Sequence, residues 1–414
     1  MMGRQSIYKK FAAARGGIIF IKRYALRVEA AAEVIKYFKK EWDFVAWMAP
    51  ANYLDIPDYV EKVKSVIGID AAKIKFFSHE DISLNDQMYI ELYDLADENR
   101  VFCVIDESLS IKNTSSGRTR RLLAMQGKFK YRLLMSKSPI CRGLRDIYSQ
   151  MQFMDSTVLG MTETQFLHQF MPFYTDDNAV SKRWSLPHLE KEAALLLKPY
   201  ILFCDFKDNL KIVHREYQFE LDAAEKEVYR EDKESFLKNK SSVAYLQVIQ
   251  RFQYYYTICR QKVEQLRRLL NEISSRKEKV VIYTKYLSEI KFLRESGLLK
   301  GSKYVIMSGT TNKIKAATLF EMDFNIMICT YKVEMPRLIL QGCGNVIYFS
   351  QTFDYKDKMY ALSRFYGDNE LHLNVYDFWV NTKLEALIKD NLSRKKKVLQ
   401  NMCKIMSYDE ACNL

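Results

Sequence analysis

Short hydrophobic runs alternate with amphipathic stretches in the first half of the chain. Each run ends in a turn or at the start of a helical stretch, and the runs occupy residues 16–21, 43–50, 73–78, 101–107 and 131–139. Between about residues 218 and 276 the pattern changes to long helical periodicity without strand signals. The hydrophobic runs then return at residues 279–286, 303–309, 325–331, 345–350 and 373–379. Alternation of this kind predicts parallel sheets flanked by helices.

The simplest architecture is therefore an α/β fold with two parallel-sheet lobes and a helical insertion. We predict a first lobe over residues 1–210, a helical insertion or protrusion over 211–277, and a second lobe over 278–414 that ends in a basic amphipathic helix. The chain has 414 residues, which is enough for such lobes and their cores. With only 14 Gly and 7 Pro it has no flexible linker or low-complexity segment.

The composition is that of a globular protein in a reducing compartment. The longest hydrophobic runs have the length of strands, so no membrane-spanning segment is expected. No apolar stretch typical of a signal peptide follows the basic residues near the N-terminus. The eight cysteines occur singly, without a CxxC pair, which argues against a metal site. We expect a cytoplasmic protein without bound metal.

The net charge adds a prediction about the partner. The formal charge is +13 at pH 7, and the excess of Lys and Arg is spread along the chain. A basic protein of this kind favours a polyanionic partner, most often nucleic acid.

The strongest chemical signal is an acidic pair after a hydrophobic strand. Asp106 and Glu107 follow the run VFCVI, and the carboxyl ends of strands are where doubly wound folds bind their ligands. An Asp at such a place can hold the magnesium of a bound nucleotide. An Asp-Glu pair by itself is more often a solvated turn.

The residues after this pair resemble the Swi/Snf family of helicase superfamily 2. Its pattern of an acidic strand, "RIKN", "SGTPI" and a following helix is matched in order by Ile111-Lys112-Asn113, Ser136–Ile140, Leu144–Gln150 and Phe153–Asp155. Further segments resemble other motifs of the family, namely residues 49–55, 76–82, 198–210, 280–295, 305–331 and 346–379. The resemblance covers nearly the whole chain from Gln5 onward. It implies two RecA-like lobes and a motor acting on double-stranded DNA.

The nucleotide pocket of that family is degenerate here. Aligning Gln5 and the GGIIF strand with the family places residues 20–29 on "LADEMGLGKT". The glycines become Ala25 and Arg27, the lysine becomes Val28, and the threonine becomes Glu29. Phosphate loops need glycines so that backbone N–H groups converge, a lysine for charge, and a hydroxyl for magnesium. All three requirements are lost together.

The second lobe departs from the family at its arginine pair. The R-x-x-R pattern reads Arg364-Phe365-Tyr366-Gly367, so the outer arginine is missing. Such an arginine stabilises the charge on the transferred phosphoryl group. We therefore interpret Asp106, Glu107 and Arg364 as vestigial, and we expect no catalytic residues and no cofactor. ATP and magnesium would bind only if Lys22, Arg23 and Arg27 rebuilt a cationic pocket.

The loops that contact DNA in the family need fewer special residues, because they bind phosphates through backbone N–H groups and hydroxyls. The resemblance implies DNA contacts at Pro50, Asn52, Ser78, Lys112, Asn113, Ser116, Lys285, Tyr286, Ser308, Gly309, Thr330 and Lys332. An aromatic cluster, Phe252 and Tyr254 to Tyr256, has helical spacing that favours packing over base stacking.

Together these features predict a helicase-like protein that binds double-stranded DNA and has an inactive ATPase site. It would act as a DNA binder or scaffold in a DNA-processing complex, together with other proteins. The lack of an appended chromatin-reading domain favours a phage or prokaryotic source. Two alternatives stay open. The first is an active ATP-dependent translocase with a non-standard pocket. The second is a protein–protein adaptor or inhibitor without DNA binding.

Overall fold

A computed structural model describes residues 2–68, 70–141, 143–175, 181–183, 185–205, 210–238, 245–331, 333, 340, 342–366 and 370–412. Side chains are described over 8–68, 70–141, 143–173, 185–202, 210–235, 250–331, 333, 340, 342–366 and 370–402. The chain forms two compact units. The first comprises residues 1–207 and 395–414, and the second comprises residues 208–394.

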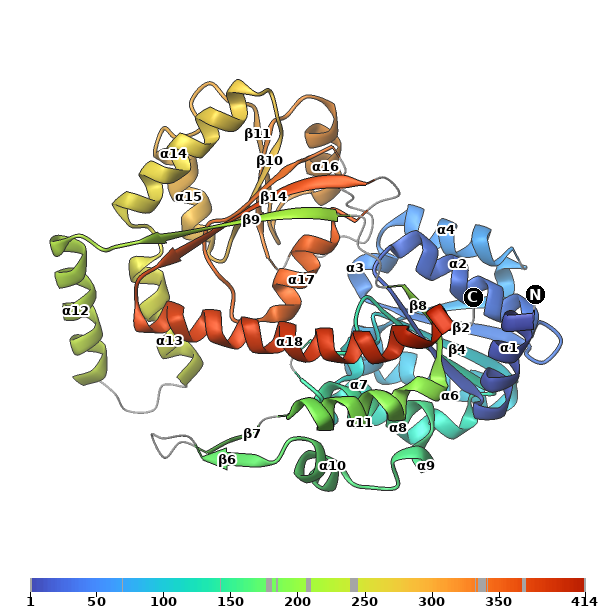
Figure 1. Ribbon diagram of the computed structural model, residues 1–414. Helices are drawn as coiled ribbons and strands as arrows, with labels where there is room; N and C mark the ends of the chain where they lie inside the picture. Colours follow the sequence, from blue (N-terminus) through green and yellow to red (C-terminus); the bar gives the residue numbers. More distant parts are fainter. Residues whose placement is uncertain are drawn as a thin grey trace. The chain divides into compact units, whose positions relative to one another are not determined.

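The first unit is built on a six-stranded parallel sheet (Figure 1). Its strand order is β3-β2-β4-β5-β1-β8. The strands are β1 (Gly16–Ile21), β2 (Phe44–Ala49), β3 (Ile74–Ser78), β4 (Val101–Asp106), β5 (Tyr131–Ser136) and β8 (Ile201–Asp205). All side chains of β1 and β4 are buried, as expected for central parallel strands that are covered on both faces. The hydrophobic runs of the first lobe are thus confirmed as strands.

Helices cover both faces of this sheet and create two hydrophobic cores. One face is covered by α1 (Met2–Ala14), α2 (Tyr24–Tyr37), α3 (Ala51–Leu54) and α4 (Pro57–Ile67). The other elements of this unit are α5 (His79–Leu84), α6 (Asp86–Glu98), α7 (Gly117–Met125), α8 (Arg145–Met154), α9 (Ser156–Leu159), α10 (Glu163–Phe170) and α11 (Pro187–Leu197). The short strands β6 (Phe173–Thr175) and β7 (Ser181–Arg183) form a separate antiparallel pair.

The second unit has a parallel six-stranded sheet of its own, with the order β11-β12-β10-β13-β14-β9. The strands are β9 (Leu210–Phe219), β10 (Val280–Thr284), β11 (Tyr304–Met307), β12 (Ile326–Thr330), β13 (Asn345–Tyr348) and β14 (Leu371–Val380). The helices are α12 (Ala223–Lys238), α13 (Tyr245–Tyr256), α14 (Arg260–Ser275), α15 (Leu287–Glu295), α16 (Lys313–Met322), α17 (Tyr355–Ser363) and α18 (Lys383–Cys412). Two parallel sheets with surrounding helices confirm the predicted α/β fold with two RecA-like lobes.

The structure divides the chain differently from the predicted boundaries of 211–277 and 278–414. Residues 210–219 form β9, which pairs with β14 over ten residues, so the predicted insertion begins with a strand of the second sheet. Its last helix, α14, buries Leu266 and Leu270 in the core of the second unit. Helix α18 begins in the second unit, whereas Met402 near its end lies in a core of the first. Hydrophobic faces of these segments find partners far away in the sequence, which explains the difference.

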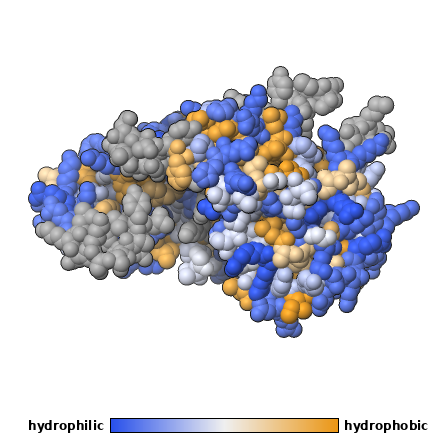
Figure 2. All heavy atoms as spheres, turned by 90° about the horizontal axis from the view of Figure 1, so that it is seen from below, coloured by the Kyte–Doolittle hydropathy of each residue, from blue (hydrophilic) through white to orange (hydrophobic). Residues whose placement is uncertain are grey.

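The described surface is largely polar. Figure 2 shows a face on which hydrophilic residues predominate and hydrophobic residues form small groups between them. Single exposed hydrophobic residues are normal for a globular protein. Among the described residues, no helix has the length and hydrophobicity needed to cross a bilayer.

Candidate nucleotide site and nucleic-acid interface

The connection between β1 and α2 stands where the sequence resemblance places the phosphate loop. Strand β1 ends at Ile21 and α2 begins at Tyr24, so only Lys22 and Arg23 connect them. A phosphate loop needs a longer glycine-rich segment whose backbone N–H groups converge on one anion. The four aligned pocket residues lie inside α2 instead, namely Ala25, Arg27, Val28 and Glu29. The backbone here is helical and does not form a phosphate cradle.

The side chains at the lysine and threonine positions also lack the required chemistry. Val28 is fully buried in the hydrophobic core between α2 and the first sheet. Glu29 is exposed, with its Oε1 3.8 Å from Lys62 Nζ. A carboxylate would repel the phosphates of a nucleotide. Gln5 lies in α1, and its side chain is outside the described ones. The residues present therefore do not fit ATP with magnesium.

The guanidinium of Arg27 pairs with both carboxylates at the end of β4. Arg27 Nη2 donates to Glu107 Oε1 at 2.8 Å and lies 3.2 Å from Asp106 Oδ1. Arg27 and Asp106 are completely buried, and Glu107 is 5% exposed. In motors of this fold, carboxylates at this place act on a phosphate-bound metal. Here the Arg27 guanidinium neutralises these carboxylates. Arg27 stands at a position that aligns with a glycine of the Swi/Snf motif.

Aromatic hydroxyls complete this buried cluster. Tyr59 donates to Asp106 Oδ2 at 2.7 Å, and Trp47 Nε1 donates to the Tyr59 hydroxyl at 3.0 Å. Tyr53 lies 3.4 Å from Glu107 Oε1 and donates to it. Burial raises the pKa of Tyr59, and the neighbouring Asp106 charge raises it further, so the phenol stays a donor. Sequence reasoning missed these partners, since a Tyr in an amphipathic helix gives no signal of its target.

The backbone of the cluster keeps an unusual conformation. Glu107 has a φ of 57°, which is the left-handed region that non-glycine residues seldom adopt. Its backbone N–H donates to Asp106 Oδ1 at 2.9 Å. Conformations of this kind gather at functional sites.

Arg364 of the second unit is held inside its own core. It is 7% exposed, its Nη1 donates to the Tyr283 hydroxyl at 3.1 Å, and its Nη2 donates to the Val333 carbonyl. The guanidinium carbon lies 5.7 Å from the centroid of the Tyr283 ring. Gly367, which stands at the position of the missing outer arginine, lies outside the described residues. These contacts of Arg364 all lie within the second unit.

Two predicted DNA-contact loops of the first unit lie at one edge of its sheet. Strands β2 and β3 are neighbours, and Pro50 and Ser78 stand at their carboxyl ends. Ser78 is the N-cap of α5. Its hydroxyl accepts from the Asp81 backbone N–H at 2.8 Å and donates to Asp81 Oδ2 at 2.6 Å. Asn52 is partly exposed in α3. The structure thus brings these loops together, with Ser78 already engaged in a helix cap.

The third predicted loop follows β4. Lys112 is partly buried, and its Nζ donates to Cys141 Sγ at 2.8 Å. Asn113 is exposed, and its Oδ1 accepts from the Ser115 hydroxyl at 2.8 Å. Ser116 is the N-cap of α7, whose first N–H groups can bind an anion. These groups suit phosphate better than base recognition.

The predicted DNA contacts of the second unit also share one edge of a sheet. Three adjacent strands, β11, β12 and β10, end there. Ser308 and the exposed Gly309 follow β11, Thr330 ends β12, and Lys285 and Tyr286 follow β10. Lys332 lies outside the described residues. Because the strands are parallel, their carboxyl ends bring these residues to one surface.

A buried polar network fixes the Lys285–Tyr286 turn. Glu289 Oε2 accepts from the backbone N–H groups of Lys285 and Tyr286, both at 2.9 Å, and from the Ser350 hydroxyl at 2.8 Å. Gln253 Oε1 accepts from Lys285 Nζ and, at 3.1 Å, from the Tyr286 hydroxyl. The sequence analysis did not single out Glu289 or Gln253. An acidic residue in the first turn of a helix was the available signal for Glu289.

The network continues to the start of α18. Gln253 Nε2 donates to Glu385 Oε1 at 3.1 Å, and Tyr256 donates to the same atom at 3.2 Å. Burial raises the pKa of Glu385, and the buried Lys262 ammonium opposes that shift. These contacts tie α13 and α18 to the turn after β10.

Comparisons with known proteins give a distant match to a curated helicase. No protein-family model matches the chain. A curated protein of Mycoplasma pneumoniae, described as an uncharacterized ATP-dependent helicase, is 25% identical over 267 residues, which cover 60% of this chain and 25% of that protein. The chain is thus similar over part of its length to a curated helicase, of which it spans about a quarter. A solved structure, the Sulfolobus solfataricus SWI2/SNF2 ATPase core in complex with dsDNA, matches 98% of the chain and 93% of its own, at 15% identity and a TM-score of 0.38.

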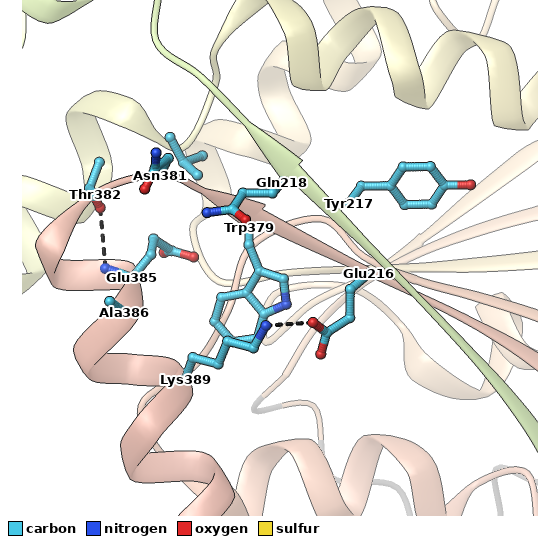
Figure 3. Close-up of a pocket in the computed structure, with 10 residues that line it drawn as sticks. Glu216, Tyr217, Gln218, Trp379, Asn381, Thr382, Glu385, Ala386 and Lys389 are labelled. Carbon is cyan, nitrogen blue, oxygen red and sulfur yellow. Dashed lines mark hydrogen bonds and ion pairs between the residues drawn. The ribbon is translucent and has the colours of Figure 1, made fainter.

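The second unit also has a pocket of about 250 Å³ at the β9–β14 end of its sheet (Figure 3). In Figure 3, Trp379 points from β14 toward the first turns of α18, and Tyr217 points away from the pocket. Lys389 and Glu216 form an ion pair at its side. The lining includes none of the residues predicted for nucleotide or DNA binding. Among the described residues, no group of His, Cys, Asp and Glu side chains could hold a metal ion.

Proposed function

We propose that this chain is a helicase-like protein that binds double-stranded DNA without sequence preference and does not hydrolyse ATP. It would serve as a DNA binder or scaffold in a DNA-processing complex. The observation that carries the proposal is the buried ion pair of Arg27 with Asp106 and Glu107, formed by a helix that replaces the phosphate loop.

Nucleotide binding would have to dismantle this arrangement. The first turns of α2 would have to unwind to expose backbone N–H groups, and the carboxylates would have to leave Arg27 for a metal. Separating a buried charge from its paired cation costs about 3–5 kcal/mol. Without the lysine and hydroxyl ligands, little binding energy remains to offset that cost.

DNA binding requires less of the chain. The net charge of +13 attracts a polyanion, and hydroxyl and N–H groups gather at one edge of each sheet. Contacts of this type hold phosphates and fix orientation without reading sequence. The loss of the nucleotide site therefore leaves the phosphate-binding groups intact.

The test combines two measurements on the full chain. Calorimetry with millimolar ATP and magnesium should show no binding, and phosphate release should stay at background with or without DNA. Equilibrium binding to two unrelated 30-base-pair duplexes should give equal affinities that fall with salt by about 0.9 log units per log unit for each phosphate contacted.

The variant Glu107→Gln supplies the control. In an inactive protein it should leave phosphate release at background, because no step depends on Glu107. A measurable ATPase that disappears in Glu107→Gln would show instead that the chain is an active motor. Absence of DNA binding at low salt would favour the protein–protein adaptor.

A further inference from the structure

Helix α13 presents an aromatic surface beside the turn after β10. Phe252 packs against the core of the second unit and Tyr256 is 2% exposed, as the predicted packing role requires. Tyr254 does not follow that prediction, because it is 49% exposed. Tyr255, next in the helix, is partly exposed. The four aromatic residues thus divide into Phe252 and Tyr256, which pack against the core, and Tyr254 and Tyr255, which are exposed or partly exposed.

The accessible pair joins Tyr286 in one aromatic group. The ring centroid of Tyr254 lies 5.8 Å from that of Tyr286 and 6.0 Å from that of Tyr255, in both cases edge to face. Arg251 lies with its guanidinium carbon 5.7 Å from the Tyr255 ring, and Lys285 Nζ lies 5.3 Å from the Tyr286 ring. We call these five residues the tyrosine platform. It combines aromatic rings with two cations.

The platform is held rigidly to the predicted DNA-contact edge. Gln253, between Phe252 and Tyr254, accepts from the Tyr286 hydroxyl at 3.1 Å and donates to the Gln351 carbonyl at 2.8 Å. The Tyr286 hydroxyl also lies 3.1 Å from the Gln250 carbonyl. These bonds fix α13 against the turn that carries Lys285. A platform ordered in advance loses little entropy when a ligand stacks on it.

We propose that the tyrosine platform stacks an unpaired nucleobase, so that the protein binds gapped DNA more tightly than continuous duplex. The proposal rests on the DNA binding proposed above and specifies which DNA is preferred. Bases inside a duplex already stack on each other, and only an unpaired base offers a free face. The cations beside the rings match the phosphates that accompany such a base. Stacking on aromatic side chains does not depend on base identity.

The expected preference follows from the strength of one stacked base. Alanine substitution of base-stacking aromatics weakens binding by about 5- to 150-fold per base. We therefore expect the full chain to bind a duplex with a central three-nucleotide gap at least about 5-fold more tightly than the same duplex without a gap. A gap whose nucleotides carry no bases should bind like the continuous duplex. This third DNA separates stacking from the flexibility of gapped DNA.

Variants locate the effect on the platform. Tyr254→Ala should reduce the gap preference to about one and leave duplex affinity unchanged, and Tyr254→Phe should keep the preference, since stacking needs only the ring. Tyr93→Ala is the matched control. Tyr93 is a tyrosine of α6 with 37% exposure and a lysine, Lys128, 4.3 Å from its ring. It should bind all three DNAs like the unchanged protein.

Fluorescence anisotropy with the three labelled DNAs measures these affinities, and circular dichroism checks that each variant is folded. Equal binding of gapped and continuous DNA, or equal binding of the two kinds of gap, overturns the platform while the proposed duplex binding stands. The same holds if Tyr254→Ala keeps the preference. Tyr255→Ala gives a second test of the platform if Tyr254→Ala does not fold. Failure to bind any of the DNAs overturns both proposals.

Discussion

The carboxyl ends of β4 and β10 occupy comparable places in the two sheets. The side chains at these two ends differ in their burial and in their partners. At the end of β4, Asp106 and Glu107 are buried and neutralised by Arg27. At the end of β10, Lys285 and Tyr286 are partly exposed. The buried Glu289 holds their turn by accepting hydrogen bonds from both backbone N–H groups. One edge is closed by its own side chains, and the other leaves Lys285 and Tyr286 partly exposed.

The difference reflects how many groups each task needs. Phosphoryl transfer depends on a glycine loop, a cation, metal ligands and an arginine that act together. When one of these groups is lost the reaction stops, and the others no longer contribute to a function. Phosphate contacts act independently, and each survives the loss of its neighbours. A closed nucleotide site and open contact loops are therefore compatible within one chain.

The largest expected effect tests whether Arg27 closes the first site. Arg27→Met should destabilise the protein by about 3–5 kcal/mol, because two buried carboxylates lose their cation. Urea denaturation followed by tryptophan fluorescence measures the change. Arg100→Met is the control, since its pair with Asp43 is exposed and should contribute below about 1 kcal/mol.

A compensated variant sharpens this result. Adding Asp106→Asn and Glu107→Gln to Arg27→Met removes the unpaired charges and should recover most of the lost stability. A change within about 1 kcal/mol for Arg27→Met alone would mean that the ion pair does not close the site.

A smaller effect is expected at the support of the second site. Glu289→Gln keeps the size of the side chain but replaces one carboxylate oxygen by an NH₂ group. The Lys285 and Tyr286 backbone N–H groups then lose the strength of a charged acceptor. We expect a loss of about 1–3 kcal/mol in stability and weaker DNA binding that is equal for all sequences. Glu295→Gln, exposed on the same helix, should change neither quantity. Unchanged DNA affinity in folded Glu289→Gln would remove the β10 turn from the interface.

The smallest effect concerns a single phosphate contact. Lys112→Gln should lower the slope of log affinity against log salt by about 0.9, with little change in stability. Affinity measurements on a 30-base-pair duplex from low to moderate salt give the slope. Lys128→Gln is the control, because Lys128 pairs with Asp97 on α6. An unchanged slope for Lys112→Gln would show that Cys141, and not DNA, is the partner of this lysine.

Much of the fold could be predicted from local pattern. The run GGIIFI forms the buried strand β1. The following segment ALRVEAAAEVIKY forms α2, because it contains no glycine and is rich in alanine, which favours a helix. The same substitutions predicted that no phosphate loop forms, and the aligned residues lie in helix α2. Strand β9 was not predicted, although hydrophobic and polar residues alternate along it. Its stability comes from pairing with β14, which lies far away in the sequence.

The sequence by itself determined most of the strands and helices, and it predicted which ligands of a nucleotide are replaced. Only the tertiary structure decided where the remaining charges and rings point. Arg27 meets its carboxylates across eighty positions of sequence, and Tyr254 stays accessible while Tyr256 is buried. Backbone propensity acts over a few residues and can be read locally. The partner of a side chain depends on which strand ends and helix faces meet, and that is settled only when the sheets assemble.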